Sequence, residues 1–135
     1  MTDVGPDVSG IYAVAAPAEV VFGTLTDPDR TTRWLPGGAV AEYDGPELVR
    51  VRAGDRVLAF RVSTAAEELR MEWSAAAGDG PHGSMRVQDS SVGGSTVEVQ
   101  LWVAAEGLDL DRVRALVEEG VMHLRRDVED NFNAG

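Results

Sequence analysis

The spacing of apolar residues divides the chain into three regions, of which the first predicts a strand followed by two short helices. Residues 9–16, "SGIYAVAA", have the composition of a strand, and Pro17 stands where a helix over "PAEVVFGTL" can begin. Asp27 is a candidate cap for a second helix that starts at Pro28 and ends near Trp34. A proline-glycine breaker then frees the chain for a different pattern.

The middle region, residues 38–103, alternates apolar and polar positions in six short runs. "AGDR" and "SVGGS" have the composition of hairpin turns, and "AAAGDGPHG" is a longer connection that contains His82. This spacing leaves no room for crossover helices and therefore predicts an antiparallel meander. Charged positions mark the outward side, so the opposite side points inward: Tyr43, Val49, Val51, Leu58, Phe60, Val62, Leu69, Met71, Trp73, Met85, Val87, Val97, Val99, Leu101 and Val103.

The last region, about residues 109–132, has the period of one long helix, with Asp109 or Asp111 as its cap. Its apolar stripe contains Val113, Leu116, Val117, Gly120, Val121, Leu124 and Val128. Such a stripe needs a broad apolar surface, which the inward side of the strands supplies. We therefore expect an α+β fold in which a curved antiparallel sheet of about seven strands wraps around the long helix.

Composition restricts the function more than the fold. The 135 residues predict one domain over 1–135, and the absence of cysteine excludes disulfides and thiolate chemistry. A net charge of −11 disfavours nucleic acid and anionic lipid as partners. No run is apolar enough to cross a membrane, and the N-terminus lacks a signal-peptide pattern, so we expect a cytoplasmic protein without membrane insertion. All 12 basic residues are arginine, which excludes a Schiff-base lysine.

The segment "APAEVVFGTLTDPDRTTRWLPGG" resembles the opening segment of the START-like, or SRPBCC, superfamily. It is similar both to the polyketide cyclase/dehydrase and lipid-transport group and to the branch related to activators of chaperone ATPases. The resemblance implies the helix-grip order β-α-α-β6-α and a cavity between the closing helix and the sheet. It also implies that the cavity takes a small hydrophobic molecule such as a lipid or polyketide. The superfamily shares no catalytic motif that could be carried onto this chain.

Few residues are candidates for chemistry. His123 and Asp127 lie four residues apart near the inward helical face and could form an oriented base, or a plain surface hydrogen bond. Tyr43 is the one inward strand hydroxyl that parity supports, and is our first candidate for a polar anchor. His82 is expected to be a solvated loop residue. With two histidines far apart, we expect no metal site and no cofactor.

The expected cavity combines aromatic, thioether and aliphatic side chains with one glycine. A glycine within a helix costs about 1 kcal/mol relative to alanine, so Gly120 either enlarges the cavity or relieves a close contact with the sheet, for example with Trp73 or Met71. Adaptable methionines suit an irregular pocket. The candidate lining residues are Trp34, Tyr43, Phe60, Met71, Trp73, Met85, Leu101, Gly120, Val121 and Leu124.

Three functions remain open at this stage. A mainly apolar cavity with one or two polar groups favours binding or transport of a small hydrophobic molecule. A cyclase or dehydratase would use Tyr43 or the pair of His123 and Asp127 in the same cavity. A chaperone-associated interaction module, or a homodimer, would instead use the convex face, where Trp102 has the opposite parity to Leu101.

Overall fold

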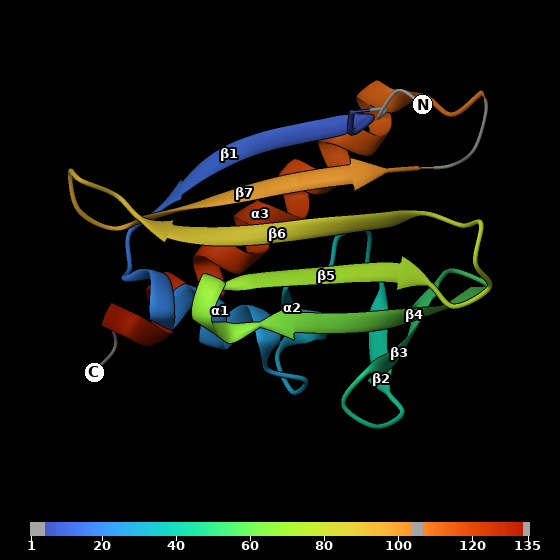
Figure 1. Cartoon of the computed structure of the whole chain (residues 1–135), viewed down its shortest axis with the longest axis horizontal. Coiled ribbons are helices and arrows are strands. Elements are labelled where there is room, and N and C mark those ends of the chain that lie inside the picture. Colours follow the sequence, from blue (N-terminus) through green and yellow to red (C-terminus); the bar gives the residue numbers. More distant parts are fainter. Residues whose placement is uncertain (1–4, 104–106, 134–135) are drawn as a thin grey trace.

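The structure of the protein, a computed structural model, describes residues 5–103 and 107–133. One strand and two helices come first, then six strands, and a long helix closes the chain (Figure 1). The elements are β1 (Val8–Val14), α1 (Ala18–Thr26), α2 (Thr31–Trp34), β2 (Val40–Tyr43), β3 (Leu48–Ala53), β4 (Arg56–Ala65), the 3-10 turn η1 (Ala66–Glu68), β5 (Arg70–Ala75), β6 (His82–Asp89), β7 (Ser95–Trp102) and α3 (Leu110–Asn133). The predicted α+β helix-grip order is confirmed.

All seven strands form one antiparallel sheet in the order β1-β7-β6-β5-β4-β3-β2. Strands β2 to β7 are consecutive neighbours joined by short connections, as a meander requires, and β1 pairs with β7 at one edge. The predicted "AGDR" and "SVGGS" turns connect β3 to β4 and β6 to β7. In the first of them Gly54 has φ +64°, a conformation that glycine adopts without steric cost.

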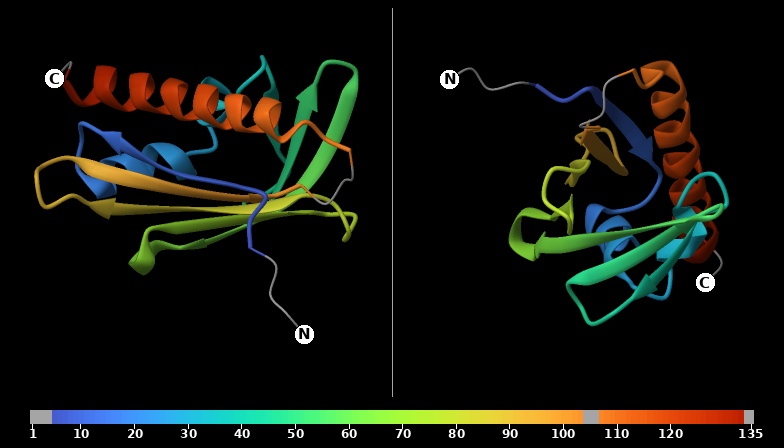
Figure 2. Two further views of the ribbon diagram at one scale, coloured as in Figure 1. Left: turned by 90° about the horizontal axis from the view of Figure 1, so that it is seen from above. Right: turned by 90° about the vertical axis from the view of Figure 1, so that its right-hand side faces the viewer.

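The sheet curves around α3, so that it has an inner face toward the helix and an outer face away from it (Figure 2). The inner-face residues of the central strands are almost completely buried, because they meet the apolar side of α3 and of α1. The core combines Val14, Ala16, Ala18, Val21, Phe22, Leu25, Trp34, Met71, Met85, Val87, Val97, Val99, Val121, Leu124 and Val128. The strand parity predicted from the sequence is therefore correct for this region.

Two details of the helices differ from the sequence prediction. The second helix does not begin at Pro28: Asp27 accepts a hydrogen bond from the Asp29 backbone N–H in a turn, and α2 starts only at Thr31. Leu116 was expected on the buried stripe of α3, but it is 39% exposed because the first half of α3 packs less closely than the second.

Asp109 is confirmed as a cap, since its Oδ1 accepts from the Asp111 N–H. Within the described ranges, no helix is long and apolar enough to cross a membrane.

Gly120 marks the closest approach between α3 and the segment after α2. A Cβ built there would lie 3.3 Å from the Trp34 carbonyl oxygen and 3.4 Å from Pro36 Cδ. The glycine thus relieves a contact with the turn at the end of α2, and not with Trp73 or Met71 as the sequence suggested. Space beside this position is filled by protein.

Alanine substitutions at two helical glycines should separate helix propensity from packing. In α1 a Cβ at Gly23 would have no atom within 4 Å, so Gly23→Ala should stabilise the protein by about 1 kcal/mol. Gly120→Ala gains the same helix propensity, but its Cβ would be crowded against the Trp34 carbonyl oxygen and the Pro36 ring. The net increase in unfolding free energy should therefore be clearly smaller than for Gly23→Ala. Denaturant unfolding measures both, and equal stabilisation by the two variants would contradict the packing account.

Candidate functional site

Burial on the inner face decreases along β7 and from β7 to the beginning of β4, although Val8 of β1 and Val49 of β3 stay buried at 1% and 5% exposed. Along β7, Val97 is 0% exposed and Val99 is 3% exposed, whereas Leu101 is half-buried. Along β4, Phe60 is half-buried and Leu58 is 44% exposed. The inner face is therefore closed where α1 and α2 pack on it, and it is open toward β2, β3 and the beginning of α3.

We call this second region the open end and define it by its apolar side chains: Val51, Leu58, Phe60, Trp73, Leu101, Val113 and Leu116. Cross-strand pairs place Leu58 beside Val51 and connect Leu101 through Gly83 to Trp73. The first half of α3 lies over the same region, since Arg114 donates to the Ser9 carbonyl at 3.0 Å while Arg125 reaches Ala13, further along β1. These residues form the partly exposed apolar edge of the helix-sheet interface, which we call the mouth.

Trp73 takes its place on the inner face because its neighbour on β6 has no side chain. A Cβ at Gly83 would lie 2.5 Å from Trp73 Cζ2, so the indole covers the glycine directly. Any larger residue at position 83 would displace the ring. The pair of Gly83 and Trp73 thus forms a flat aromatic wall at the inner edge of the open end.

The candidate lining residues divide between the two ends. Tyr43, Phe60, Trp73 and Leu101 are half-buried and lie toward the open end or beside it. The others are buried, either in the core cluster or, for Gly120, against the turn after α2: Trp34, Met71, Met85, Gly120, Val121 and Leu124.

Tyr43 is not alone on the inner face, because Tyr12 of the edge strand β1 also points inward. Tyr12 shares the parity of the buried Val8 and Val14, and its ring lies over Gly10, where a Cβ would come within 2.5 Å of the hydroxyl oxygen. The sequence analysis did not assign an inward side to this strand, because residues 8–14 contain no charged position that marks the outward side; Ile11 faces outward and is 67% exposed. The signal in the sequence that could have indicated an inward Tyr12 was Gly10, two residues earlier on the same strand.

The environments of the two tyrosine hydroxyls differ. Tyr43 shares a hydrogen bond of 3.1 Å with the Thr31 hydroxyl, which ties β2 to α2. Burial raises the pKa of the Tyr12 hydroxyl above its ordinary value of 10.0; the Glu118 carboxylate acts in the same direction, while the Arg114 guanidinium opposes it. Tyr12 is therefore a neutral hydrogen-bond donor at physiological pH, close to the first half of α3.

Two buried polar atoms in the described part of the chain have no hydrogen-bond partner: Trp34 Nε1 and Ser95 Oγ. Trp34 belongs to the core cluster at the closed end, where its carbonyl oxygen lies near Gly120. An unpaired buried donor is costly, and such groups call for an explanation.

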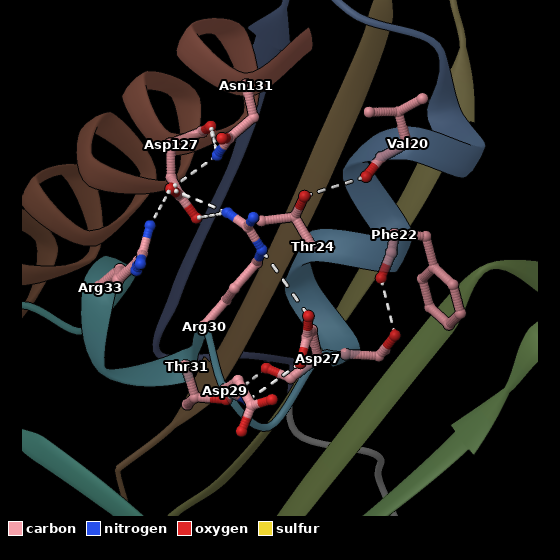
Figure 3. A network of polar contacts seen from close by, with 11 residues as sticks. Val20, Phe22, Thr24, Asp27, Asp29, Arg30, Thr31, Arg33, Asp127 and Asn131 are labelled. Atoms are coloured by element: carbon pink, nitrogen blue, oxygen red, sulfur yellow. Dashed lines mark hydrogen bonds and ion pairs between the residues drawn. The ribbon is translucent and has the colours of Figure 1, made fainter.

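The expected pairing of His123 with Asp127 does not form. Asp127 accepts from Arg30 Nη1 at 3.2 Å on both carboxylate oxygens, from Arg33 at 3.4 Å and from the Asn131 side chain (Figure 3). His123 Nδ1 instead lies 3.4 Å from the Leu35 carbonyl oxygen. The sequence could not show these ion pairs, because Arg30 and Arg33 precede Asp127 by almost a hundred residues. The carboxylate holds the α2 segment on α3 and does not orient the imidazole.

The other histidine also differs from expectation. His82 is the first residue of β6, on the outer face, and its ring stacks on Trp102 with 4.9 Å between ring centroids. Trp102 thus lies on the outer face, as its parity predicted. Among residues 5–103 and 107–133, no three His, Asp or Glu side chains are grouped closely enough to hold a metal ion.

Removing the Asp127 charge should weaken the attachment of α2 to α3. The Asp127 side chain is only 10% exposed, so Asp127→Asn leaves two guanidinium groups short of a partner and should cost about 1–3 kcal/mol of unfolding free energy. Asp130→Asn, on the exposed side of the same helix, is the matched control and should change stability by less than about 0.5 kcal/mol. Equal effects in urea titrations would show that the network is not a structural clamp.

The raised pKa of Tyr12 predicts a measurable alkaline transition. Because the folded-state pKa lies above the unfolded value, this group favours the folded protein below pH 10, and the contribution is lost as the pH rises through the folded pKa. We expect the phenolate absorbance component that Tyr12→Phe removes to titrate above pH 10. Wild-type stability should fall more steeply than that of Tyr12→Phe at these pH values. A Tyr12 component at or below pH 10 would refute the assignment.

Solved structures of similar fold are known, although no protein-family model and no curated protein matches the chain. The di-domain ARO/CYC StfQ from the steffimycin biosynthetic pathway superimposes with a TM-score of 0.73 at 16% identity, over 93% of this chain and 46% of that one. The Aha1 dimer from Colwellia psychrerythraea gives 0.71 at 14% identity, over 90% and 95%. Protein CV1439 from Chromobacterium violaceum gives 0.69 at 17% identity, over 90% and 96%.

These likenesses concern the fold, because identities below 25% carry no activity with them. They agree with the strand order, the curvature of the sheet and the position of α3 described above. The opening segment resembled two branches of the superfamily. The neighbours include both ARO/CYC polyketide cyclases and Aha1. The chain has the START-like, or SRPBCC, helix-grip fold.

Proposed function

We propose that the protein binds a small, mainly hydrophobic molecule at the open end of the helix-sheet interface. The observation that carries the proposal is the decrease in burial along the inner face, from Val97 at 0% exposed to Leu58 at 44% exposed. An apolar surface that is left partly uncovered is typical of a ligand site or an interaction site.

The polar group nearest the first half of α3 favours a ligand that carries a hydrogen-bond acceptor. Tyr12 contributes a hydroxyl that burial keeps protonated. This hydroxyl is a donor, and the side chains that define the open end are aliphatic or aromatic. A flat molecule with carbonyl or phenol oxygens, such as an aromatic polyketide, fits this combination. The fold-level likeness to cyclases of polyketide pathways makes the same class a natural first choice.

Binding is a better proposal than catalysis for this site. Asp127 is occupied by two arginines and cannot activate His123, and the Tyr43 hydroxyl already shares a hydrogen bond with Thr31. A general base needs a free position within hydrogen-bond reach of the substrate, and these residues do not provide one together. The cyclase or dehydratase alternative would therefore have to rely on Tyr12, whose neighbour of basic character in the described part of the chain is the Glu118 carboxylate.

Two neighbouring positions on β4 provide a direct test. Leu58 points to the inner face and Val57 to the outer face, and both are about half exposed, at 44% and 54%. N-phenyl-1-naphthylamine, a neutral apolar fluorophore, should brighten on binding to the wild type. Leu58→Glu places a charge at the mouth and should raise the dissociation constant at least about tenfold. Val57→Glu should change it by less than about twofold.

Two results would remove this proposal. One is the absence of any fluorescence increase with the folded wild-type protein at micromolar concentration. The other is an equal loss of affinity in Val57→Glu and Leu58→Glu, which would show that the probe binds without regard to the inner face. Circular dichroism of both variants checks that the sheet is retained.

A further inference from the structure

We propose that the outer face of the sheet holds a second site, independent of the open end, for a planar aromatic molecule that carries a carboxylate. A depression of about 580 Å³ lies on this face, within the size range of small-molecule sites. Figure 1 looks onto the same face, with α3 behind the sheet. It is lined by residues at outward positions of β4 to β7, by Glu47 before β3, and by Val62, Trp73 and Gly83, which alternate with the outward residues along their strands. The outward residues are Arg61, Ser63, Arg70, Glu72, Ser74, His82, Ser84, Gln100 and Trp102.

One cross-strand row forms the centre of this depression. Arg61 on β4 pairs with Ser74 on β5, Ser74 with His82 on β6, and His82 with Trp102 on β7. The row therefore contains a planar cation, a small hydroxyl and two stacked aromatic rings, in that order. Neighbouring strands are about 4.8 Å apart, so side chains in such a row stand next to one another on one face.

The stack of His82 and Trp102 fixes the orientation of the imidazole. The two rings are nearly parallel, at 7°, with centroids 4.9 Å apart. This distance is close to the strand spacing, so the rings stand upright side by side and do not lie flat on the sheet. One face of His82 is covered by Trp102. The other face therefore looks across Ser74 toward Arg61.

The strand spacing between His82 and Arg61 leaves room for one aromatic ring. Their backbones are two strands apart, about 9.6 Å. A planar ligand between two planar groups needs about 7–8 Å, which is two contacts at van der Waals separation. Ser74 is small enough to serve as a floor beneath it. Guanidinium groups also stack on aromatic faces, so Arg61 can form the second wall of the slot.

The charges at the depression favour an anion next to Arg61. Arg70 is neutralised by Glu72, since its Nη2 lies 2.7 Å from Glu72 Oε1. In the described ranges Arg61 forms no ion pair or hydrogen bond, and Glu47 at the rim is not within ion-pair distance of it. An unpaired guanidinium is suited to a carboxylate, which it can bind through two hydrogen bonds, and this local attraction opposes the repulsion from the net charge of −11.

Binding of 2-naphthoate, with neutral 2-naphthalenemethanol and cationic 2-naphthylmethylamine as isosteric comparisons, tests the proposal. Amide chemical-shift mapping by NMR gives both the affinity and the location. We expect the naphthoate to bind at least about tenfold more tightly than either comparison and to shift the amides of Ser74 and His82. Arg61→Gln should abolish this preference, and Ser74→Leu should block binding by filling the floor of the slot.

Arg86→Gln is the matched control, because Arg86 lies on the same face of β6 but does not line the depression, and it should change naphthoate affinity by less than about twofold. Leu58→Glu should also leave the affinity unchanged, which separates this site from the open end.

The proposal is overturned if the alcohol or the amine binds as tightly as the naphthoate, or if Arg61→Gln has no effect. It is equally overturned if the face is covered by a second copy of the chain in solution and naphthoate does not displace it.

Discussion

The packing of the second half of α3 against the sheet is the interaction on which the rest of the structure depends. Val121, Leu124 and Val128 are at most 2% exposed, and they meet the inner face of the central strands together with Leu25 of α1. Each fully buried side chain of this kind contributes about 1.5–3 kcal/mol relative to an exposed one. The contact fixes the direction of the helix, and the helix in turn determines where the sheet is covered and where it is not.

The functional geometry follows from the fact that only half of this helix is anchored. The Asp127 network and the contacts of Gly120 and Glu119 hold α3 to α2 and the segment after it from the middle of the helix onward, whereas Arg114, near the start of the helix, reaches the backbone of the edge strand. The apolar surface at the open end is thus loosely covered because α3 is held against the sheet and α2 at the opposite end. Regions with fewer buried contacts open more easily, which suits the entry of a ligand.

Much of this fold follows from periodicity. Alternation predicted the six-strand meander and the inward parity of Met71, Met85 and Val99, and the helical period predicted α3 to within one residue at each end. Parity also placed Trp102 on the outer face. These features follow from local spacing, which the sequence displays directly.

Contacts between distant segments could not be predicted in the same way. Asp127 looked like a partner for His123 because the two are four residues apart, but Arg30 and Arg33 compete for it from another helix. Gly120 required a reason, and the reason lies in the Trp34 carbonyl, not in the sheet. Tyr12 was missed because its strand has no charged position from which an outward side could be assigned. In each case the deciding interaction crosses between elements whose relative placement no local pattern specifies.

The central claim is that the open end, and not some other apolar surface, holds the hydrophobic ligand. Intermolecular NOEs between bound N-phenyl-1-naphthylamine and the methyl groups of the protein test it most directly. Contacts to Leu58, Leu101 and Leu116, which lie at the mouth, are the predicted result. Contacts confined to outward residues such as Val57 and Ile11 would contradict the account, because these side chains are on the opposite face of the sheet.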